Sequence, residues 1–324
     1  MTEDQQGQVQ REQGILERWQ DSTDQLEDTA KATTSGDLDV ANTRRELAER
    51  QARLRRRGLD LEGIVNTDES LWVNFLSCGL AASRAVGRVV TAPSRGRPSQ
   101  AIGTGALIGP SLLITNNHVI ESASDAAGMG VQFGYAYGDD GTDPAPQYCR
   151  CVPDRFFCTD VELDFTVVAV ADLDGRPPGD TYGTLALIEE TGKAVKAEFL
   201  NVIHHPGGDP QRISIRENQM VAEDDLWLRY RSDARRGSSG APVFNDQWEM
   251  VALHHGGLPV RDETGARLGL NGERWTPEMG EDAKAYTANE GARVSRIVRR
   301  LRAADLDPAA RTLIDEALKQ GANP

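Results

Sequence analysis

The chain has 324 residues, which is enough for two ordinary domains or for one large domain with extensions. Its apolar content of 39% and charged content of 27% are typical of a globular protein, and its formal net charge of -14 argues against nucleic acid and anionic membranes as partners. No stretch approaches the roughly 20 apolar residues that would span a bilayer, and the polar, acidic first 15 residues contain no apolar signal core. These features predict a cytoplasmic protein, in which the four cysteines would remain free thiols.

Residues 1–60 are predicted to form a helical extension, because their few apolar residues recur at helical spacing. Residues 1–40 carry ten acids and three bases, whereas residues 41–60 carry seven bases and three acids. Opposite charges on neighbouring helices would favour a hairpin, or docking on a regulatory protein partner. We expect the extension to be dispensable for folding of the remaining chain. The arginines near its end are interpreted as a solvated helix end: Arg53, Arg55, Arg56 and Arg57.

The rest of the chain is predicted to be strands between two helical segments. Residues 61–84 contain a more apolar helix, capped by Asp68 or Ser70, that we expect to pack on the strands. Over residues 85–300 the pattern changes to short β-branched or aromatic segments separated by Gly, Pro or Asp clusters, as in an antiparallel barrel or sandwich. Residues 301–324 are predicted to form a C-terminal helix that starts at an Asp-Pro pair.

Two segments carry candidate acid–base groups. His118 ends the sequence TNNH after two predicted strands, where an imidazole can face a cleft, although a single histidine after a strand is more often structural. Asp164 opens the otherwise apolar strand DFTVVAV. A carboxylate buried there needs a hydrogen-bond donor, and a histidine Nδ1–H is a suitable one. The alternative is a solvated acid at the start of a strand.

A third segment, RRGSSGAPVF, carries a candidate nucleophile. Gly237 and Gly240 flank Ser238 and Ser239, which allows a tight turn with its backbone N–H groups turned inward. Such donors suit a developing oxyanion, because they require no ordering of side chains. A Gly-Ser-Ser-Gly sequence is often only a linker, but a linker is not normally followed by a buried strand such as APVF.

Together the three motifs resemble a known family. His118, Asp164 and Ser239 occur in the His, Asp, Ser order of the chymotrypsin-like serine proteases. The sequences TNNHV, PGG (after His205) and GSSGAPVF are similar, in the same order, to motifs of the bacterial glutamyl-endopeptidase-like branch. The resemblance covers roughly residues 85–300, and three ordered motifs are far more specific than one.

The resemblance implies a mainly β fold of two packed six-stranded antiparallel barrels with the active site in the cleft between them. It implies that Ser239 attacks a peptide carbonyl, His118 takes and returns the proton, and Asp164 orients the imidazole. The N–H groups of Gly237 and Ser239 would form the oxyanion hole. The substrate would be a protein or peptide, and neither a metal nor an organic cofactor is implied.

One departure from the family concerns activation. Zymogen-type members have an acid immediately before the nucleophile, which binds the amino group freed by activation cleavage. Here that position is Ser238, which cannot form an ion pair. We therefore expect regulation, where there is any, to come from the helical segments or from a partner.

The substrate specificity is left open by two conflicting signals. Asp233 lies six residues before Ser239, where the resemblance implies the floor of a pocket that selects Arg or Lys. His254 and His255 lie on the strand that would wall the pocket, and in glutamyl endopeptidases a histidine there recognises acidic side chains. Cleavage after Arg or Lys is the favoured prediction. Either histidine could instead pair with Asp233 or face solvent.

Two other classes of protein compete with a peptidase. One is a catalytically inactive barrel that only binds peptides. The other is a metal site made by three cysteines with one of two histidines. The cysteine spacing fits no standard zinc signature, so core cysteines are favoured. The residues concerned are Cys149, Cys151, Cys158, His204 and His205.

Overall fold

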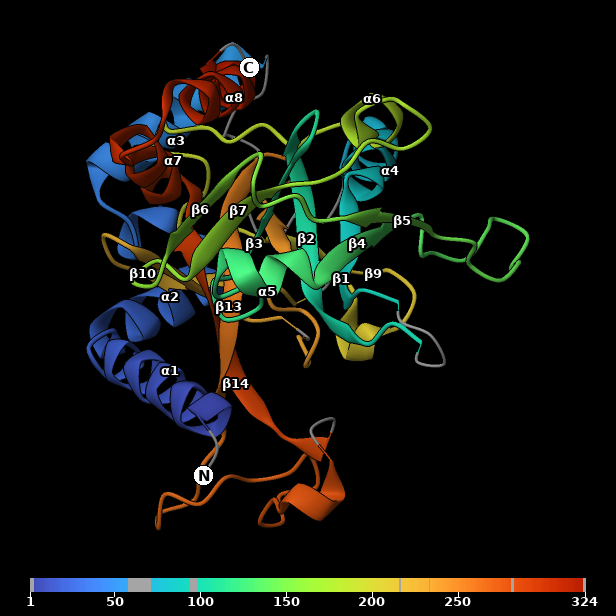
Figure 1. Cartoon of the computed structure of the whole chain (residues 1–324). Coiled ribbons are helices and arrows are strands. Elements are labelled where there is room, and N and C mark those ends of the chain that lie inside the picture. The colour runs from blue at the N-terminus through green and yellow to red at the C-terminus, as the bar shows by residue number, and fades with distance from the viewer. Residues whose placement is uncertain are drawn as a thin grey trace.

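The computed structural model of the chain describes residues 3–57, 71–93, 98–215, 217–232, 234–280 and 283–322. Within these ranges the strands form two seven-stranded antiparallel sheets, and helices from both ends of the chain lie over them (Figure 1). The prediction of a mainly β protein with helical extensions is confirmed. None of the described helices is long and apolar enough to cross a membrane.

The first sheet curls until its two ends meet. Its strand order is β5-β4-β1-β2-β3-β7-β6. Beyond the end of β5, Cys151 bridges Val170, and the N–H of Val152 donates to the carbonyl of Ala169 at 2.7 Å, so the sheet closes as a barrel. In chain order its strands are β1 (Val86–Thr91), β2 (Ala101–Gly109), β3 (Leu112–Thr115), β4 (Met129–Phe133), β5 (Gln147–Arg150), β6 (Phe157–Asp160) and β7 (Phe165–Ala169).

The second sheet closes in the same way. Its order is β10-β11-β14-β13-β12-β8-β9, and a bridge between Phe199 and Gln219 joins the segments that lead into β8 and β10. In each sheet the closing contact joins six strands, as expected, and a short seventh strand, β6 or β9, extends one edge of the sheet. The strands are β8 (Asn201–His204), β9 (Arg212–Ser214), β10 (Met220–Glu223), β11 (Trp227–Tyr230), β12 (Pro242–Phe244), β13 (Met250–Pro259) and β14 (Tyr286–Arg293).

The larger apolar core fills the first barrel and continues under the C-terminal helices. Helix α7 (Val294–Ala303) buries Ile297 and Leu301, and it crosses the domain boundary expected at residue 300. Helix α8 (Pro308–Ala322) begins as expected from its Asp-Pro pair, since Asp307 accepts hydrogen bonds from the next turn's N–H groups. The short helices between strands are α5 (Ala123–Ala127), α6 (Pro178–Tyr182), η1 (Leu38–Val40), η3 (Pro206–Gly208) and η4 (Pro277–Met279).

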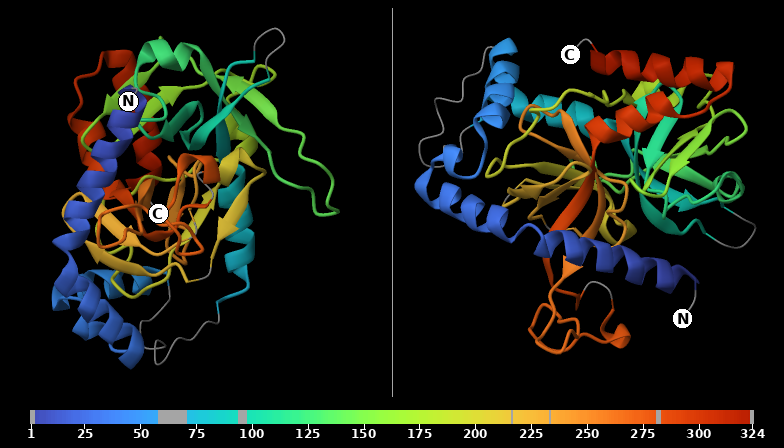
Figure 2. Two further views of the ribbon diagram at one scale, coloured as in Figure 1. Left: turned by 90° about the horizontal axis from the view of Figure 1, so that it is seen from below. Right: turned by 90° about the vertical axis from the view of Figure 1, so that its left-hand side faces the viewer.

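Three N-terminal helices, α1 (Glu3–Gln20), α2 (Thr23–Ser35) and α3 (Arg44–Arg56), wrap around the second barrel (Figure 2). Thr29 donates to the carbonyl of Val221 in β10, and Arg18 of α1 pairs with the buried Glu290 of β14. Arg53 of α3 is itself buried. Its interpretation as part of a solvated helix end is wrong, because carboxylates of the second barrel lie within ion-pair distance.

Helix α4 (Asn74–Arg84) lies between the N-terminal helices and β1 in the chain. The predicted caps Asp68 and Ser70 lie outside the described residues, and so does the predicted start of this helix. The helix packs on the β12–β13 turn, where Trp248 donates its indole N–H to the carbonyl of Phe75 at 2.9 Å. Gly79 allows this approach, since a Cβ there would lie 2.3 Å from the Trp248 ring.

Candidate active site

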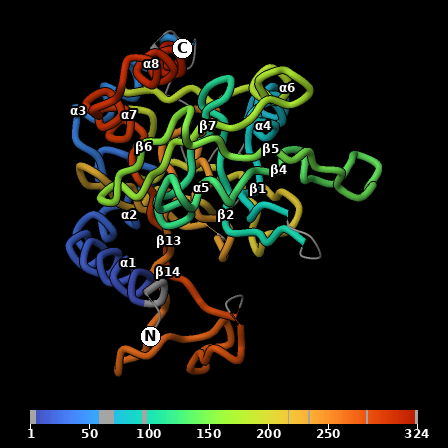
Figure 3. Tube along the Cα trace, viewed as in Figure 1, coloured from blue at the N-terminus to red at the C-terminus, as the bar shows by residue number. Residues whose placement is uncertain are grey.

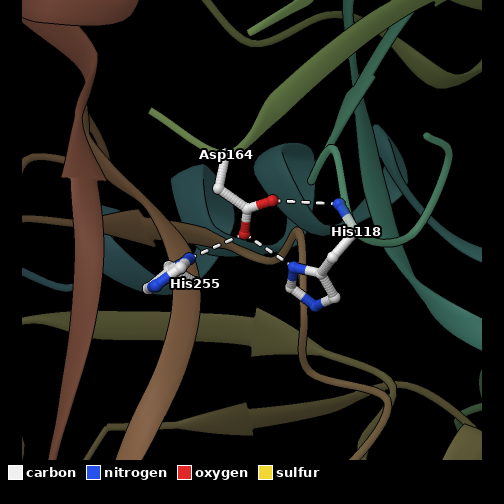
Figure 4. Close-up of side chains that lie close together, drawn as sticks. All are labelled: His118, Asp164 and His255. Carbon is white, nitrogen blue, oxygen red and sulfur yellow. Dashed lines mark hydrogen bonds and ion pairs between the residues drawn. The ribbon is translucent and has the colours of Figure 1, made fainter. Parts of the chain in front are cut away.

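Strand pairing in the first barrel brings His118 and Asp164 together. His118 follows β3 and Asp164 directly precedes β7, and these strands pair in antiparallel register with Thr115 opposite Thr166. The end of β3 therefore lies beside the start of β7. Asp164 has a positive φ of 46°, a left-handed conformation that Asp and Asn adopt more readily than most residues. The turn aims its carboxylate at His118 (Figure 4).

Both carboxylate oxygens of Asp164 contact His118. Oδ1 accepts the backbone N–H of His118 at 2.9 Å, and Oδ2 lies 2.6 Å from the imidazole Nδ1. Burial by itself would raise the pKa of Asp164, but the charge and hydrogen bond of His118, with a further hydrogen bond from His255, hold it well below its usual range. The carboxylate is therefore ionised and can only accept, so Nδ1 of His118 carries a proton, and Nε2 is the nitrogen that can act as a base when the ring is neutral.

A second imidazole contacts the same aspartate. Nδ1 of His255, on β13 of the second barrel, also lies 2.6 Å from Asp164 Oδ2. The sequence did not indicate this contact, because the two residues are 91 positions apart and belong to different barrels. One signal was present: His254 and His255 precede two glycines, and the pairing of β13 with β14 shifts register there. Such a bulge redirects a side chain and often lies near an active site.

The turn that carries Ser239 is fixed against the first barrel. The N–H of Thr104 in β2 donates to the Ser239 carbonyl at 2.8 Å. Gly240 has a φ of 82°, and a Cβ there would lie 2.3 Å from Oγ1 of Thr115, at the end of the strand that leads to His118. The structure therefore places the turn beside the His118 segment. Within the described residues, no hydrogen bond joins the Ser239 hydroxyl to His118.

The backbone around Ser239 leaves two donors available. Gly237 has a φ of 93°, and its carbonyl accepts the Thr104 hydroxyl at 2.7 Å. In the described ranges of the chain, neither the N–H of Gly237 nor that of Ser239 donates to a protein acceptor. Between them, Ser238 is buried and its hydroxyl lies 2.8 Å from Nδ1 of His204. A neutral hydrogen bond thus occupies the place where zymogen-type members form an ion pair.

The three candidate specificity residues have different outcomes. Asp233 lies outside the described residues. Nδ1 of His254 lies 2.7 Å from the hydroxyl of Tyr230, and burial lowers the pKa of His254 to about 3, so its ring is neutral. His255 faces Asp164, as described above. Both histidines thus have their Nδ1 atoms engaged inside the protein.

Two groups of residues could be considered for a metal. Ligand atoms of His118, Asp164 and His255 lie within 4.8 Å of one another, but both Nδ1 atoms are at hydrogen-bond distance from the carboxylate. A zinc ion, with bonds of about 2.0–2.1 Å to nitrogen, would have to replace both hydrogen bonds. The cysteine alternative is not assembled among the described residues. Cys149 and Cys151 belong to the core of the first barrel, where burial raises each pKa to about 12, whereas His204 and His205 lie at the end of β8 in the second.

Comparisons with known proteins agree with the three motifs. Residues 103–253 match the family described as "Trypsin-like peptidase domain". The chain is 37% identical to the "Uncharacterized protein y4fB" of Sinorhizobium fredii over 282 residues. This matched region covers 79% of this chain and 41% of that protein. The chain therefore spans about two fifths of this relative's length.

Similar solved structures include the active form of the Rv3671c protease from M. tuberculosis, with 16% identity, a TM-score of 0.43, and coverage of 75% of this chain and 93% of that one. Another is a Glu endopeptidase in complex with MPD, with 16% identity, a TM-score of 0.43, and coverage of 74% and 93%.

Proposed function

We propose that this chain, whose residues 103–253 match the trypsin-like peptidase domain, is a serine endopeptidase that uses Ser239, His118 and Asp164. The observation that carries the proposal is the double contact between Asp164 and His118, through the imidazole Nδ1 and through the backbone N–H. This arrangement fixes both the tautomer and the direction of the ring, which is the task of the acid in a Ser-His-Asp triad.

In the proposed reaction, Oγ of Ser239 attacks the carbonyl carbon of the scissile peptide bond while Nε2 of His118 removes the hydroxyl proton. The N–H groups of Gly237 and Ser239 stabilise the oxyanion of the tetrahedral intermediate. His118 then returns the proton to the leaving amine, and an acyl-enzyme on Ser239 remains. Water, activated by the same imidazole, hydrolyses that ester. Asp164 stays ionised and stabilises the imidazolium that forms in each step.

The decisive test is labelling with a fluorophosphonate probe together with peptide hydrolysis. The wild type should label and turn over, whereas Ser239→Ala should fold but do neither, and His118→Ala should lose labelling because the serine is no longer activated. Asp164→Asn should fold and lose about 10⁴ in kcat, the effect typical of this triad. Normal turnover by Ser239→Ala would contradict the mechanism, and a wild type that does not label would favour the inactive peptide-binding barrel.

We further propose cleavage after Arg or Lys, with Asp233 at the base of the pocket, in an intracellular protein. A buried carboxylate is costly without a cation, so a basic side chain that completes the pair would be strongly preferred over a neutral one. The four free cysteines are in keeping with a reducing compartment.

The specificity is measured by cleaving a peptide library with the wild type and with Asp233→Ala. Cleavage after Arg and Lys that disappears in Asp233→Ala supports the proposal. Cleavage after Glu that is lost in His254→Ala would instead assign the pocket to the histidine, as in glutamyl endopeptidases.

A further inference from the structure

We propose that His255 is a positioning residue of the triad, which donates a second imidazole N–H to Asp164 and so holds the carboxylate for His118. The inference rests on the proposed function and adds a fourth residue to the proposed active site. Oδ2 of Asp164 lies 2.6 Å from Nδ1 of His118 and 2.6 Å from Nδ1 of His255 (Figure 4). An ionised carboxylate only accepts, so each Nδ1 must carry a hydrogen.

The two imidazoles hold the carboxylate from different directions. Their rings are nearly perpendicular, with an interplanar angle of 79° and centroids 6.2 Å apart. Oδ2 has two lone pairs, one for each ring, while Oδ1 accepts the backbone N–H of His118. The side chain of Asp164 thereby has three donors and no free rotation, although its backbone lies in a sharp left-handed turn.

His255 also links the two barrels. Asp164 and His118 belong to the first barrel, whereas His255 lies on β13, the middle strand of the second sheet, which pairs with the strand that follows the Ser239 turn. A bond from His255 to Asp164 therefore aligns the acid–base pair of one barrel with the nucleophile of the other. A displacement of about 1 Å between such groups costs orders of magnitude in rate, so an alignment of this kind has kinetic consequences.

The ring of His255 is itself held in place. Its centroid lies 4.7 Å from that of Trp227, and the guanidinium of Arg18 lies 4.7 Å above the same indole. On the neighbouring residue, a Cβ at Gly256 would lie 3.1 Å from Cδ1 of Ile15, so helix α1 packs against the strand at this point. The pairing register of β13 shifts between His254 and Gly256, so His255 lies at a bulge, and packing from β11 and α1 holds its buried ring in place.

The alternative is that His255 is only a buried histidine that fills space. Two substitutions of equal size separate the possibilities. In His255→Asn the amide nitrogen lies where Nδ1 was and still donates, whereas His255→Leu has the same shape without a donor. We expect His255→Leu to lower kcat about 10- to 100-fold with little change in KM, and His255→Asn to retain most of the wild-type kcat.

A spectroscopic measurement tests the hydrogen bonds without relying on turnover. In the Ser239→Ala background with isotope-labelled histidine, two imidazole N–H protons should resonate far downfield, from His118 and His255. In His255→Leu one signal should disappear and the His118 signal should move further downfield, because Asp164 then has one donor fewer. This readout remains valid if Ser239→Ala shows that the proposed reaction is wrong.

Each outcome decides the inference. A single downfield proton in the Ser239→Ala protein, or a His118 signal that does not move when His255→Leu is added to it, would overturn the inference. Equal kcat losses in His255→Asn and His255→Leu would show that packing and not donation matters, and would also overturn it. If His255→Leu does not fold, His255→Gln replaces it, because its amide donor is displaced by one bond. A kcat of His255→Gln equal to that of the wild type would again contradict a positioning role.

Discussion

Among single residues, three buried histidines outside the triad should contribute to the loss of stability in acid. Burial is the main cause that lowers the pKa of His204 to about 4, of His205 to about 4 and of His254 to about 3. Each ring is therefore neutral in the folded protein, whereas in the unfolded chain it would titrate near the ordinary value of about 6.5. The folded state consequently binds fewer protons than the unfolded state over the interval between these values.

We expect the free energy of unfolding to be highest above about pH 6.5 and to fall as the pH is lowered toward 4. Three protons taken up on unfolding correspond to a slope of up to about 4 kcal/mol per pH unit, since stability rises with pH wherever the unfolded state binds more protons. Urea unfolding at a series of pH values measures this slope.

His205→Phe is the matched control for this prediction. Among the described residues, Nε2 of His205 has no hydrogen-bond partner and Nδ1 bonds only to the carbonyl of Asp209, so the substitution removes one hydrogen bond and one titrating group. The slope between pH 4 and 6.5 should decrease by about 1.4 kcal/mol per pH unit. An unchanged slope would mean that His205 is already protonated, or hydrated, in the folded protein.

How far the site could be predicted differs from residue to residue. His118, Asp164 and the Ser239 turn are marked by local sequence, because a polar residue at the end of an apolar strand and a glycine-flanked serine are visible in short segments. The structure brings the first two into contact. His255 could not be assigned in this way, because its partner comes from the other barrel and its inward direction depends on a bulge.

At the scale of elements, helix α3 is docked by a buried ion pair. Arg53 contacts both carboxylate oxygens of Glu249 at 2.9 Å, and both side chains are only 3% exposed. A capping box formed by Thr43 and Glu46 fixes the start of this helix, but it has no bearing on what the far end contacts. Arginines in a run resemble a solvated helix end when their acidic partners lie far along the chain.

Arg53→Leu should lower the free energy of unfolding by about 3 kcal/mol, because α3 still covers Glu249 and leaves the carboxylate buried with one cation fewer. Arg57 and Asn245 also contact Glu249, which limits the loss. The control is Arg56→Leu on the same helix. Arg56 and its ion-pair partner Glu190 are both exposed, so the free energy of unfolding should change by no more than about 1 kcal/mol. Chemical denaturation of both variants gives the comparison, and equal effects would mean that Arg53 is hydrated in solution.

At the scale of the whole molecule, the two barrels and the helical ends could be predicted from the sequence. The docking of the N-terminal helices on the second barrel could not. The change from helical to alternating period near Ala85 located the strands. The N-terminal helices contact strands from different parts of the chain, since α1 packs on β13 and α2 on β10, and the three helices lie along one side of the molecule (Figure 3). Even the connection between β13 and β14 takes part, since Arg261 and Arg267 both pair with Glu12 of α1.

These contacts change what we expect from removing the N-terminal helices. The sequence alone favoured a dispensable extension, but α1, α2 and α3 bury Ile15, Ala32 and Leu54 and supply hydrogen bonds to β10 and cations to Glu249 and Glu290. A chain that begins at residue 58 would expose this apolar surface and leave the acids of the second barrel to repel one another.

We expect that chain to be insoluble, or to melt about 10 °C or more below the full-length protein, since a loss of roughly 4 kcal/mol shifts the melting temperature of a domain of this size by that much. It should also label more slowly with a fluorophosphonate, because Ile15 and Arg18 no longer support β13 and Trp227 beside His255. A shorter truncation that removes residues 1–11 is the control. It keeps Glu12, Ile15 and Arg18, so thermal melting and labelling should remain close to those of the whole chain. Wild-type melting of the chain from residue 58 would instead show that the second barrel is stable without its helices.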